Sequence, residues 1–588
     1  MNFDDLLKIL GDLGTYQRQR YALLCIVAVY SVTSTVGIVF YGIEPNHHCK
    51  IPSAYVDVVT SKYGNVSQEE LLNLIIPLTD KGERSSCKLY TFDEWSTNSK
   101  TTWFLVNETF YYDTARGNNK NASWTAIKHK GNNNQVGPPS SSSCPEGRVY
   151  SSDQYESTIV SEFDLGCENA WQMSTCNTVF FTGKFLSVFL TGWLSDRFGR
   201  RPVFLASISI QVLSGIALAF APNMLVFSIL FVIQGASDSS AFIAMYTLGM
   251  ELVGVSKRRI PAMGIGIFFG LGHIVMAFEA YFLRNWRHLA LAACSPGVLF
   301  VCFWWFFPES VRWLLARGRH EEAEVIIKRI ANVNKVKLEQ EAVDRLFRDG
   351  EEDHRGTTYT HIELFKTWRR AFITSVLAFI WMATMMCYYG LTLNAKGLGG
   401  SLYLSFALLG AADIPGLLAA AFFIDKFGRR KMIFGTSCLG GSLCIASGLI
   451  PTSTFYLTIT FATLGKMLIT LSKAVFSMFL VESYPTVIRH MGLSFCSSVA
   501  RLGIAITPQI LTLGSVYRPL PFIVFGSVYI GAGFLMFLVP ETLNNPLLQT
   551  VEEWDVVLDR NILGCTSKKN GNEAHDQGAT TTSEGSEL

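Results

Sequence analysis

Long apolar runs separated by short polar connections dominate the chain. A helix needs about 20 mostly apolar residues to cross a bilayer, and twelve runs reach that length. They cover 21–42, 172–194, 203–221, 225–248, 260–283, 287–307, 371–392, 402–424, 432–450, 455–481, 490–513 and 519–539. The first run has no small-residue cleavage site, so it is predicted to be a retained helix rather than a signal peptide. The pattern predicts an all-α membrane protein with twelve transmembrane helices.

Composition agrees with this pattern. Of the 588 residues, 49% are hydrophobic and 16% are charged, whereas a soluble domain is about 25% charged. The net charge of +2 gives no indication of a nucleic-acid partner. The sequence lacks a P-loop lysine motif, a supported Ser-His-Asp arrangement and metal-ligand spacing. It therefore predicts no enzyme, no cofactor and no metal.

Lysine and arginine lie in alternate short loops, and basic loops are typically cytoplasmic. Basic clusters follow the second, fourth and eighth runs, whereas the loops 221–223 and 451–454 have no basic residue. Both termini are therefore predicted to be cytoplasmic. The predicted segments are a cytoplasmic N-terminus (1–20), helix 1 (21–43), an extracellular loop (44–170), helices 2–6 (171–307), a cytoplasmic helical linker (308–370), helices 7–12 (371–540) and a cytoplasmic tail (541–588).

The predicted extracellular loop contains cysteines and glycosylation sequons, which are typical of extracellular segments. Its cysteines are Cys49, Cys87, Cys144 and Cys167, which predict two disulfides with three possible connectivities. Its predicted glycosylation sites are Asn65, Asn107 and Asn121. The tail is rich in Gly, Ser, Thr, Asn and Glu after about 561 and is predicted to be disordered there. Its end, 585–588, has a serine two places before the terminal leucine, as a PDZ ligand does.

Landmarks recur at a nearly constant offset along the chain. Asp425 follows Asp196 by 229 positions, and Glu482 follows Glu251 by 231. Two parallel six-helix halves of this kind enclose a site near mid-membrane and rock to alternate access to it. The repeated turns are predicted to form a cytoplasmic charge clasp that holds the outward-open state closed on the inside. Glycine permits the tight turn, and Asp accepts from the arginine pair or from a helix N-terminus in the neighbouring half. The clasp residues are Asp196, Arg197, Gly199, Arg200, Arg201, Glu251, Arg258, Asp425, Gly428, Arg429, Arg430, Glu482 and Arg489. The alternative is that these arginines only set topology.

Several motifs resemble the major facilitator superfamily and, more narrowly, its solute carrier family 22 of organic cation, anion and zwitterion transporters. They are LGDLGTYQ at 10–17, SDRFGRR at 195–201, NWRHL at 285–289, PESVRWLL at 308–315, YYGLTLN at 388–394 and ESYPTVIRHMG at 482–492. The resemblance implies a plasma-membrane transporter. The family usually has about six cysteines in its external loop and this chain has four, so a disulfide pattern is not transferred.

Five charged residues fall near the middle of predicted spans, where charge is costly and commonly functional. They are Lys184, Asp238, Asp413, Lys466 and Arg501. The resemblance implies that an arginine at position 501 favours anions and zwitterions, and that an acid at position 413 attracts a cation. Asp413 and Arg501 together suit a zwitterion with ammonium and carboxylate ends. The alternative for each charge is an internal ion pair.

Aromatic residues complete the predicted substrate site, because aromatic faces hold quaternary ammonium groups. They are Phe242, Tyr246, Trp381, Tyr388 and Tyr389, with packing roles as the alternative. His273 and Glu279 form a conceivable proton relay, and coupling to sodium, to protons or to no ion stays open. The sequence predicts a carrier of organic cations or carnitine-like zwitterions. The alternatives are an organic anion carrier and a non-transporting receptor or scaffold.

Overall fold

The computed structural model describes residues 3–53, 67–77, 84–90, 141–254, 259–303, 307–338, 361–451, 454–543 and 548–562, with 56, 60, 257, 340, 341, 343 and 345–347. The predicted sites Asn65, Asn107, Asn121 and Arg258, and the tail beyond 562, lie outside these residues. Contacts divide the chain into two units. The first is Met1–Val39, Ser174–Leu283 and Arg287–Leu588, and the second is Phe40–Met173 with Arg284–Trp286.

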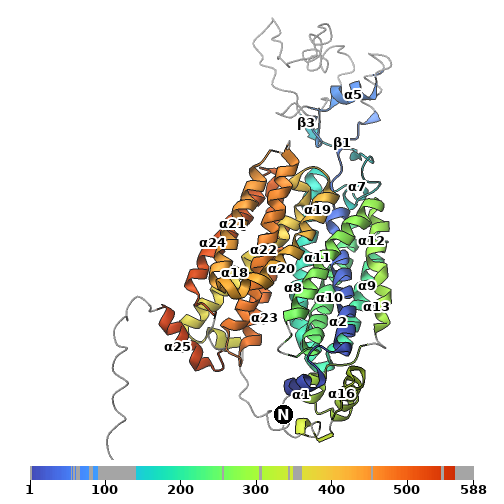
Figure 1. Ribbon diagram of the computed structural model, residues 1–588. Coiled ribbons are helices and arrows are strands. Elements are labelled where there is room, and N and C mark those ends of the chain that lie inside the picture. The colour runs from blue at the N-terminus through green and yellow to red at the C-terminus, as the bar shows by residue number, and fades with distance from the viewer. Residues whose placement is uncertain are drawn as a thin grey trace, which may run out of the picture. The chain divides into compact units, whose positions relative to one another are not determined.

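Long apolar helices build the first unit (Figure 1). They are α2 (Thr15–Val36), α8 (Ala170–Phe198), α9 (Arg200–Leu218), α10 (Met224–Glu251), α11 (Arg259–Phe282), α18 (Trp368–Leu393), α21 (Arg429–Leu449), α22 (Phe455–Ser483), α23 (Arg489–Thr512) and α24 (Leu520–Leu535). The predicted eighth helix consists of α19 (Leu402–Ala411) and α20 (Asp413–Phe427). Among the described residues, 11 helical segments are long and apolar enough to cross a membrane.

The predicted sixth helix is interrupted by a 3-10 turn. It consists of α12 (Trp286–Cys294), the 3-10 turn η3 (Ser295–Gly297) and α13 (Val298–Val301). Pro296 lies in the 3-10 turn, and proline removes a backbone donor from a helix interior. This break explains why the segment does not appear as one long helix, and the twelve-helix prediction agrees with the architecture.

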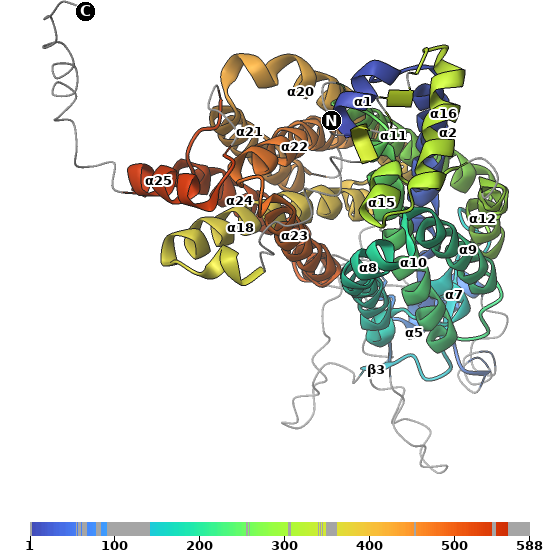
Figure 2. The same cartoon turned by 90° about the horizontal axis from the view of Figure 1, so that it is seen from below.

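The long helices form two groups, which Figure 2 shows from below. In the N-terminal half, α9 packs against α10 and α2 packs against α11. In the C-terminal half, α18 packs against α23, and α21 packs against α22 and α24. The halves meet where α11 approaches α19 and α20. A Cβ at Gly410 would lie 2.2 Å from Cβ of His273, so only glycine allows this approach.

A small helical cluster joins the N-terminus to the linker. Helix α1 (Phe3–Leu10) packs with α15 (Val311–Ala316) and α16 (His320–Asn334) around a common apolar core. Helix α16 lies in the predicted helical linker and buries Ala323, Ile327 and Ile330, which recur at helical spacing on one face. The amide Nδ2 of Asn334 donates to the carbonyl oxygen of Leu10 at the end of α1 at 2.8 Å. Its Oδ1 accepts from the backbone N–H of Tyr16 at 2.9 Å, which fixes the cluster to the start of α2.

An amphipathic helix, α25 (Val551–Ile562), follows the last span and was not predicted. It buries Trp554 and Leu558 in the core of the C-terminal half. Arg370 at the start of α18 donates from Nε to Oδ1 of Asp555 at 2.7 Å. Arg369 forms a second ion pair with Asp559. These contacts dock α25 on the end of the bundle that carries the start of α18.

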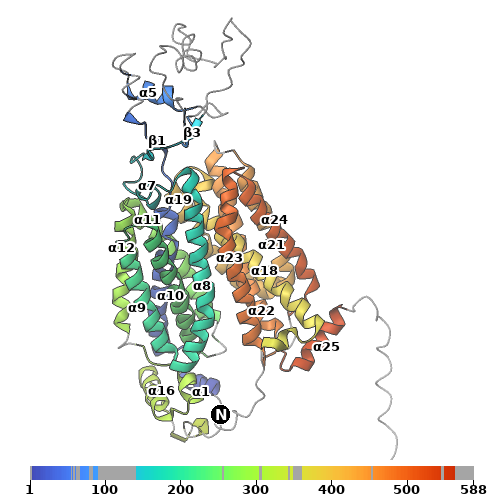
Figure 3. The ribbon, with the colours of Figure 1, turned by 180° about the vertical axis from the view of Figure 1, so that it is seen from behind.

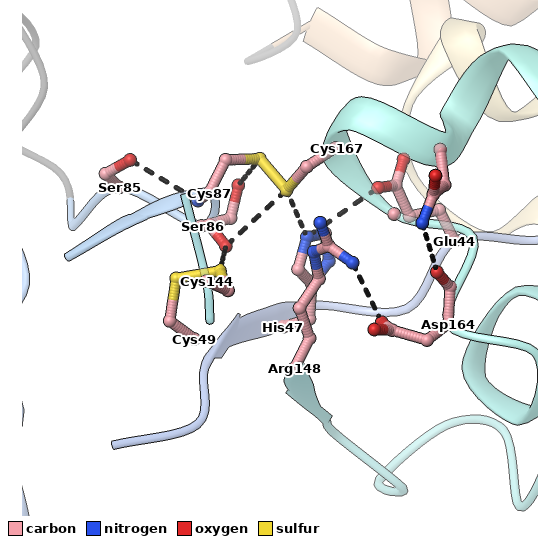
Figure 4. The surroundings of a disulfide bond; sticks show 12 residues. Glu44, His47, Cys49, Ser85, Ser86, Cys87, Cys144, Arg148, Asp164 and Cys167 are labelled. Atoms are coloured by element: carbon pink, nitrogen blue, oxygen red, sulfur yellow. Dashed lines mark hydrogen bonds and ion pairs between the residues drawn. A yellow bond between two sulfur atoms is a disulfide. The ribbon is translucent and has the colours of Figure 1, made fainter. Parts of the chain in front are cut away.

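The described residues of the second unit form two short antiparallel strand pairs and two disulfides. Strand β1 (His47–Cys49) pairs with β4 (Arg148–Tyr150), and β2 (Lys88–Tyr90) pairs with β3 (Ser141–Ser143). Cys49 bonds to Cys144, and Cys87 bonds to Cys167 (Figure 4). The four predicted cysteines therefore pair first with third and second with fourth. Short helices α3 (Ile38–Tyr41), α5 (Gln68–Ile75) and α7 (Ile159–Glu162) complete the described part.

A tyrosine buttress lies beside these disulfides. Tyr150 donates from its hydroxyl to Oδ1 of Asp164 at 2.8 Å, and Arg148 donates from Nη1 to the same oxygen at 3.0 Å. Burial and the bond to Asp164 raise the pKa of the Tyr150 hydroxyl, so it stays a donor at neutral pH. The contacts hold β4 against the segment that precedes Cys167.

Candidate functional site

One arginine in each half ties the repeated turn to the end of a neighbouring helix. In the N-terminal half, Arg200 forms ion pairs with Asp196 at 3.1 Å and with Glu251 at 3.7 Å. In the C-terminal half, Arg429 forms an ion pair with Glu482 at 3.3 Å. All these ion pairs run within one half. The structure therefore brings together predicted clasp residues of each half, and these bonds do not cross between the halves.

The other predicted clasp residues have separate contacts. Arg197 lies over the ring of Trp193, with 5.4 Å from Cζ to the ring centroid. Arg430 lies over Phe537 at 5.0 Å in the same sense. Arg489 donates from Nε to a backbone carbonyl oxygen at 3.2 Å. Asp425 lies in the last turns of α20, and its side chain is outside the described part of the chain.

Two carboxylates that the sequence prediction missed cap the helices after the turns. Glu309 accepts hydrogen bonds from the backbone N–H groups of Arg200 and Arg201 at 3.0 and 3.2 Å. Glu541 accepts hydrogen bonds from the backbone N–H groups of Arg429 and Arg430, the first two residues of α21, at 3.2 and 3.1 Å. A carboxylate at a helix N-terminus satisfies free donors and complements the helix dipole. Their signal was present, since Glu309 and Glu541 lie 232 positions apart.

Glycine is required at the first of these turns. Gly199 has a φ of 105°, and a Cβ there would lie 2.3 Å from Oε2 of Glu309. We expect Gly199→Ala to lower the apparent melting temperature of the purified protein, because a non-glycine residue at such a φ costs about 1–3 kcal/mol. Gly192→Ala is the matched control, since nothing lies within 4 Å of its Cβ. Equal melting temperatures for the two variants would contradict this account.

A second repeated arginine lies at the opposite end of the bundle. Arg287 donates from Nη1 to the carbonyl oxygen of Ala219 at 2.6 Å. Arg518 donates from Nη1 to the carbonyl oxygen of Ile450 at 3.5 Å. Both the arginines and their acceptors are 231 positions apart. Each half thus joins two of its helices by an arginine at this end, which the constant offset would have revealed.

Asp238 lies in a complete hydrogen-bonding shell in the N-terminal half. Its carboxylate pairs with Nζ of Lys184 at 2.6 Å and accepts from Ser31 at 2.5 Å. Thr35 and Gln211 donate to it at 3.0 Å each. Asp238 is 3% exposed, so this is a buried ion pair with its charges balanced. The structure favours the internal-pair alternative for Lys184 and Asp238.

The predicted charges of the C-terminal half are arranged differently. Asp413 accepts from the hydroxyl of Tyr388 at 2.7 Å and from that of Thr470 at 2.6 Å. Lys466 donates to the backbone carbonyl of Tyr388 at 2.9 Å and to the hydroxyl of Thr392. Its Nζ lies 3.3 Å from the centroid of the Tyr388 ring. One tyrosine therefore connects the predicted acid and the predicted lysine, and both are buried.

Arg501 and Lys473, like Lys466, have no ion pair among the described residues. Arg501 donates from Nη1 to the carbonyl oxygen of Ser497 in its own helix at 3.1 Å. Lys473, which the sequence prediction missed, places Nζ 3.8 Å from the centroid of the Tyr388 ring. Lys473 follows Lys466 by seven positions on α22, which is two helical turns and was a signal for a shared face.

The predicted aromatic residues lie on both halves. Trp381 stacks on a phenylalanine of α22 with 5.4 Å between centroids. Tyr389 of α18 meets Phe181 of α8 at 5.9 Å, which joins the two halves. The rings of Phe242 and Tyr246 of α10 lie 6.3 Å apart, since residues four positions apart share a helix face. Tyr389 is thus the predicted aromatic residue that contacts the opposite half directly.

The predicted relay residues have separate surroundings. His273 donates from Nδ1 to the carbonyl oxygen of Phe269 at 3.1 Å, and its ring lies 5.4 Å from that of Phe406. Oε2 of Glu279 is buried and has no hydrogen-bond partner among the described residues. No hydrogen bond joins His273 to Glu279 in this part of the chain.

Comparison with known proteins identifies close relatives over almost the whole length. A family model described as "Sugar (and other) transporter" matches residues 107–554. The human protein "Organic cation/carnitine transporter 2" is 31% identical, with 94% of each chain covered. The mouse protein "Solute carrier family 22 member 4" is 30% identical, with 95% of each covered. The proton:xylose symporter XylE, of the major facilitator superfamily, has a TM-score of 0.53 at 20% identity, over 68% of this chain and 93% of XylE.

Proposed function

Because the chain belongs to the sugar (and other) transporter family, and within it to solute carrier family 22, we propose that it carries organic cations or carnitine-like zwitterions across the plasma membrane. It is a multi-pass membrane carrier and not an enzyme. Arg501 carries this proposal, since an arginine without an ion pair inside a membrane span is suited to a carboxylate from solution. The relatives named as organic cation/carnitine transporters support the proposal that the solute also carries a cationic ammonium group.

The proposed orientation places both termini in the cytoplasm and the disulfide-bonded unit outside. The basic turns after α8 and α20 support this orientation, because basic loops stay cytoplasmic. The two disulfides support it too, since they persist in oxidising compartments.

Alternating access is proposed to occur by movement of one half against the other. Contacts between the halves gather toward the end where α19 begins. Tyr281 meets Tyr403 there at 5.6 Å, and Gln509 donates to Thr178 at 3.1 Å. Figures 1 and 3 show the two groups farther apart at the end of α1 and α25. We infer that the halves are joined at the end where α19 begins, and that each clasp keeps its own half rigid.

An uptake screen tests the proposal. Cells expressing the chain are given radiolabelled L-carnitine, tetraethylammonium or glutarate, with and without sodium. We expect saturable uptake of L-carnitine or tetraethylammonium above mock-transfected cells. Uptake of glutarate alone would support the organic anion alternative. Surface protein with no uptake of any probe would support a receptor or scaffold, and the sodium arm reports the coupling ion.

A further inference from the structure

The C-terminal half has an excess of positive charge inside its spans. Away from the helix ends it carries one carboxylate, Asp413, and the cations Lys466, Lys473 and Arg501. In the N-terminal half, by contrast, Lys184 and Asp238 balance each other. Charges inside a bilayer are costly and normally pair or face a polar path. The imbalance therefore requires a negative group that the described spans of this half do not supply.

Lys473 is the cation with the fewest polar acceptors. Lys466 has two oxygen acceptors, the carbonyl of Tyr388 and the hydroxyl of Thr392. Asp413 lies within electrostatic range of Lys473, but hydroxyl groups already donate to both carboxylate oxygens. Lys473 has a ring face at 3.8 Å and no hydrogen bond or ion pair among the described residues. The three N–H donors of the Lys473 ammonium group can therefore bond to an acceptor from outside these residues.

Two adjacent tyrosines connect Lys473 to Arg501. The rings of Tyr388 and Tyr389 lie 5.3 Å apart, and Lys473 contacts the first. Tyr389 contacts Phe181 of the opposite half, and α23, which carries Arg501, packs against α18, the helix of both tyrosines. The two cations thus lie around one aromatic pair at the boundary between the halves, where a carried solute is expected.

Resting on the proposed function, we infer that Lys473 is a second carboxylate-binding residue beside Arg501, and that the carrier selects solutes with a carboxylate over simple organic cations. Arginine supplies a planar bidentate grip and lysine a compact point charge. The tyrosine rings hold the ammonium end of a zwitterion by cation–π attraction. The solute class is a small zwitterion with a carboxylate and a quaternary or protonated amine.

The test compares Lys473→Gln with Lys473→Arg in uptake assays normalised to surface protein. We expect Lys473→Gln to raise the KM for L-carnitine about tenfold, the effect of losing one charge-assisted contact, and to leave tetraethylammonium uptake unchanged or higher. Lys473→Arg should restore most of the affinity for L-carnitine. Lys431→Gln is the control, because Lys431 is exposed at the start of α21.

A binding readout separates this inference from the proposed function. The melting temperature of the purified protein is measured with L-carnitine, glutarate or tetraethylammonium. We expect the two carboxylates to stabilise the wild type and to lose this effect in Lys473→Gln. Stabilisation without any uptake would defeat the proposed function and keep the inference. An unchanged KM, an equal loss for both solutes, or a wild type that no carboxylate stabilises would overturn the inference.

Discussion

Replacing Arg501 with Asp is expected to lower Vmax/KM for L-carnitine about 100-fold or more, while tetraethylammonium uptake is retained. Hydrogen bonds to a charged group contribute about 1.5–3 kcal/mol each, and 1.4 kcal/mol is a factor of ten. The substitution removes the donors and places a negative charge where the carboxylate binds. Radiolabelled uptake, normalised to biotinylated surface protein, measures the effect.

Arg501→Lys is the control for this substitution, because it keeps the charge and loses the bidentate geometry. It should retain an intermediate rate for L-carnitine. Since Arg501 bonds only to a carbonyl of its own helix among the described residues, the fold should tolerate both variants. If the uptake of L-carnitine and of tetraethylammonium fell equally at normal surface abundance, Arg501 would not be the residue that binds the carboxylate.

Asp238→Asn is expected to destabilise the protein strongly, by about 3–5 kcal/mol. The substitution leaves the buried ammonium of Lys184 without its partner at 2.6 Å. We expect a large drop in the melting temperature and in surface abundance. The double variant Asp238→Asn with Lys184→Gln removes both charges and should recover most of the loss.

Glu279→Gln is the matched control for this experiment. It also removes a carboxylate from a span, but Oε2 of Glu279 has no hydrogen-bond partner among the described residues. Its melting temperature should stay close to that of the wild type. If Asp238→Asn were equally harmless, or if the double variant were no better than the single one, the ion pair would not be the stabilising element.

Much of the fold was predictable because a bilayer imposes a simple requirement on sequence. A span needs a long apolar run, and no described span contradicts the twelve that the sequence predicts. The disulfide pairing was not predictable, because four cysteines allow three connectivities. Helices α1 and α25 were missed because they are too short to form a span. Their apolar residues nevertheless recur at helical spacing, as Trp554 and Leu558 do.

Most charged residues of the candidate site could be predicted from the sequence, but the residues that contact them could not. The repeated turns identified Arg200 and Arg429, but not the carboxylates that cap the next helices. Glu309 lies over 100 positions from the turn that it closes, so only the repeat offset indicated it. Lys473 was missed because its position on the Tyr388 ring depends on how α18 and α22 pack. Tertiary contact of this kind has no counterpart in local sequence.

The two disulfides of the external segment close two loops that overlap in sequence. One loop closes between Cys49 and Cys144, the other between Cys87 and Cys167, and the stretch 91–140 belongs to both. A protease that cuts the backbone once anywhere in this stretch releases nothing, because the pieces stay tied by both sulfur bridges. The carrier thus keeps its amino-terminal span covalently attached after such a nick, until the disulfides are reduced.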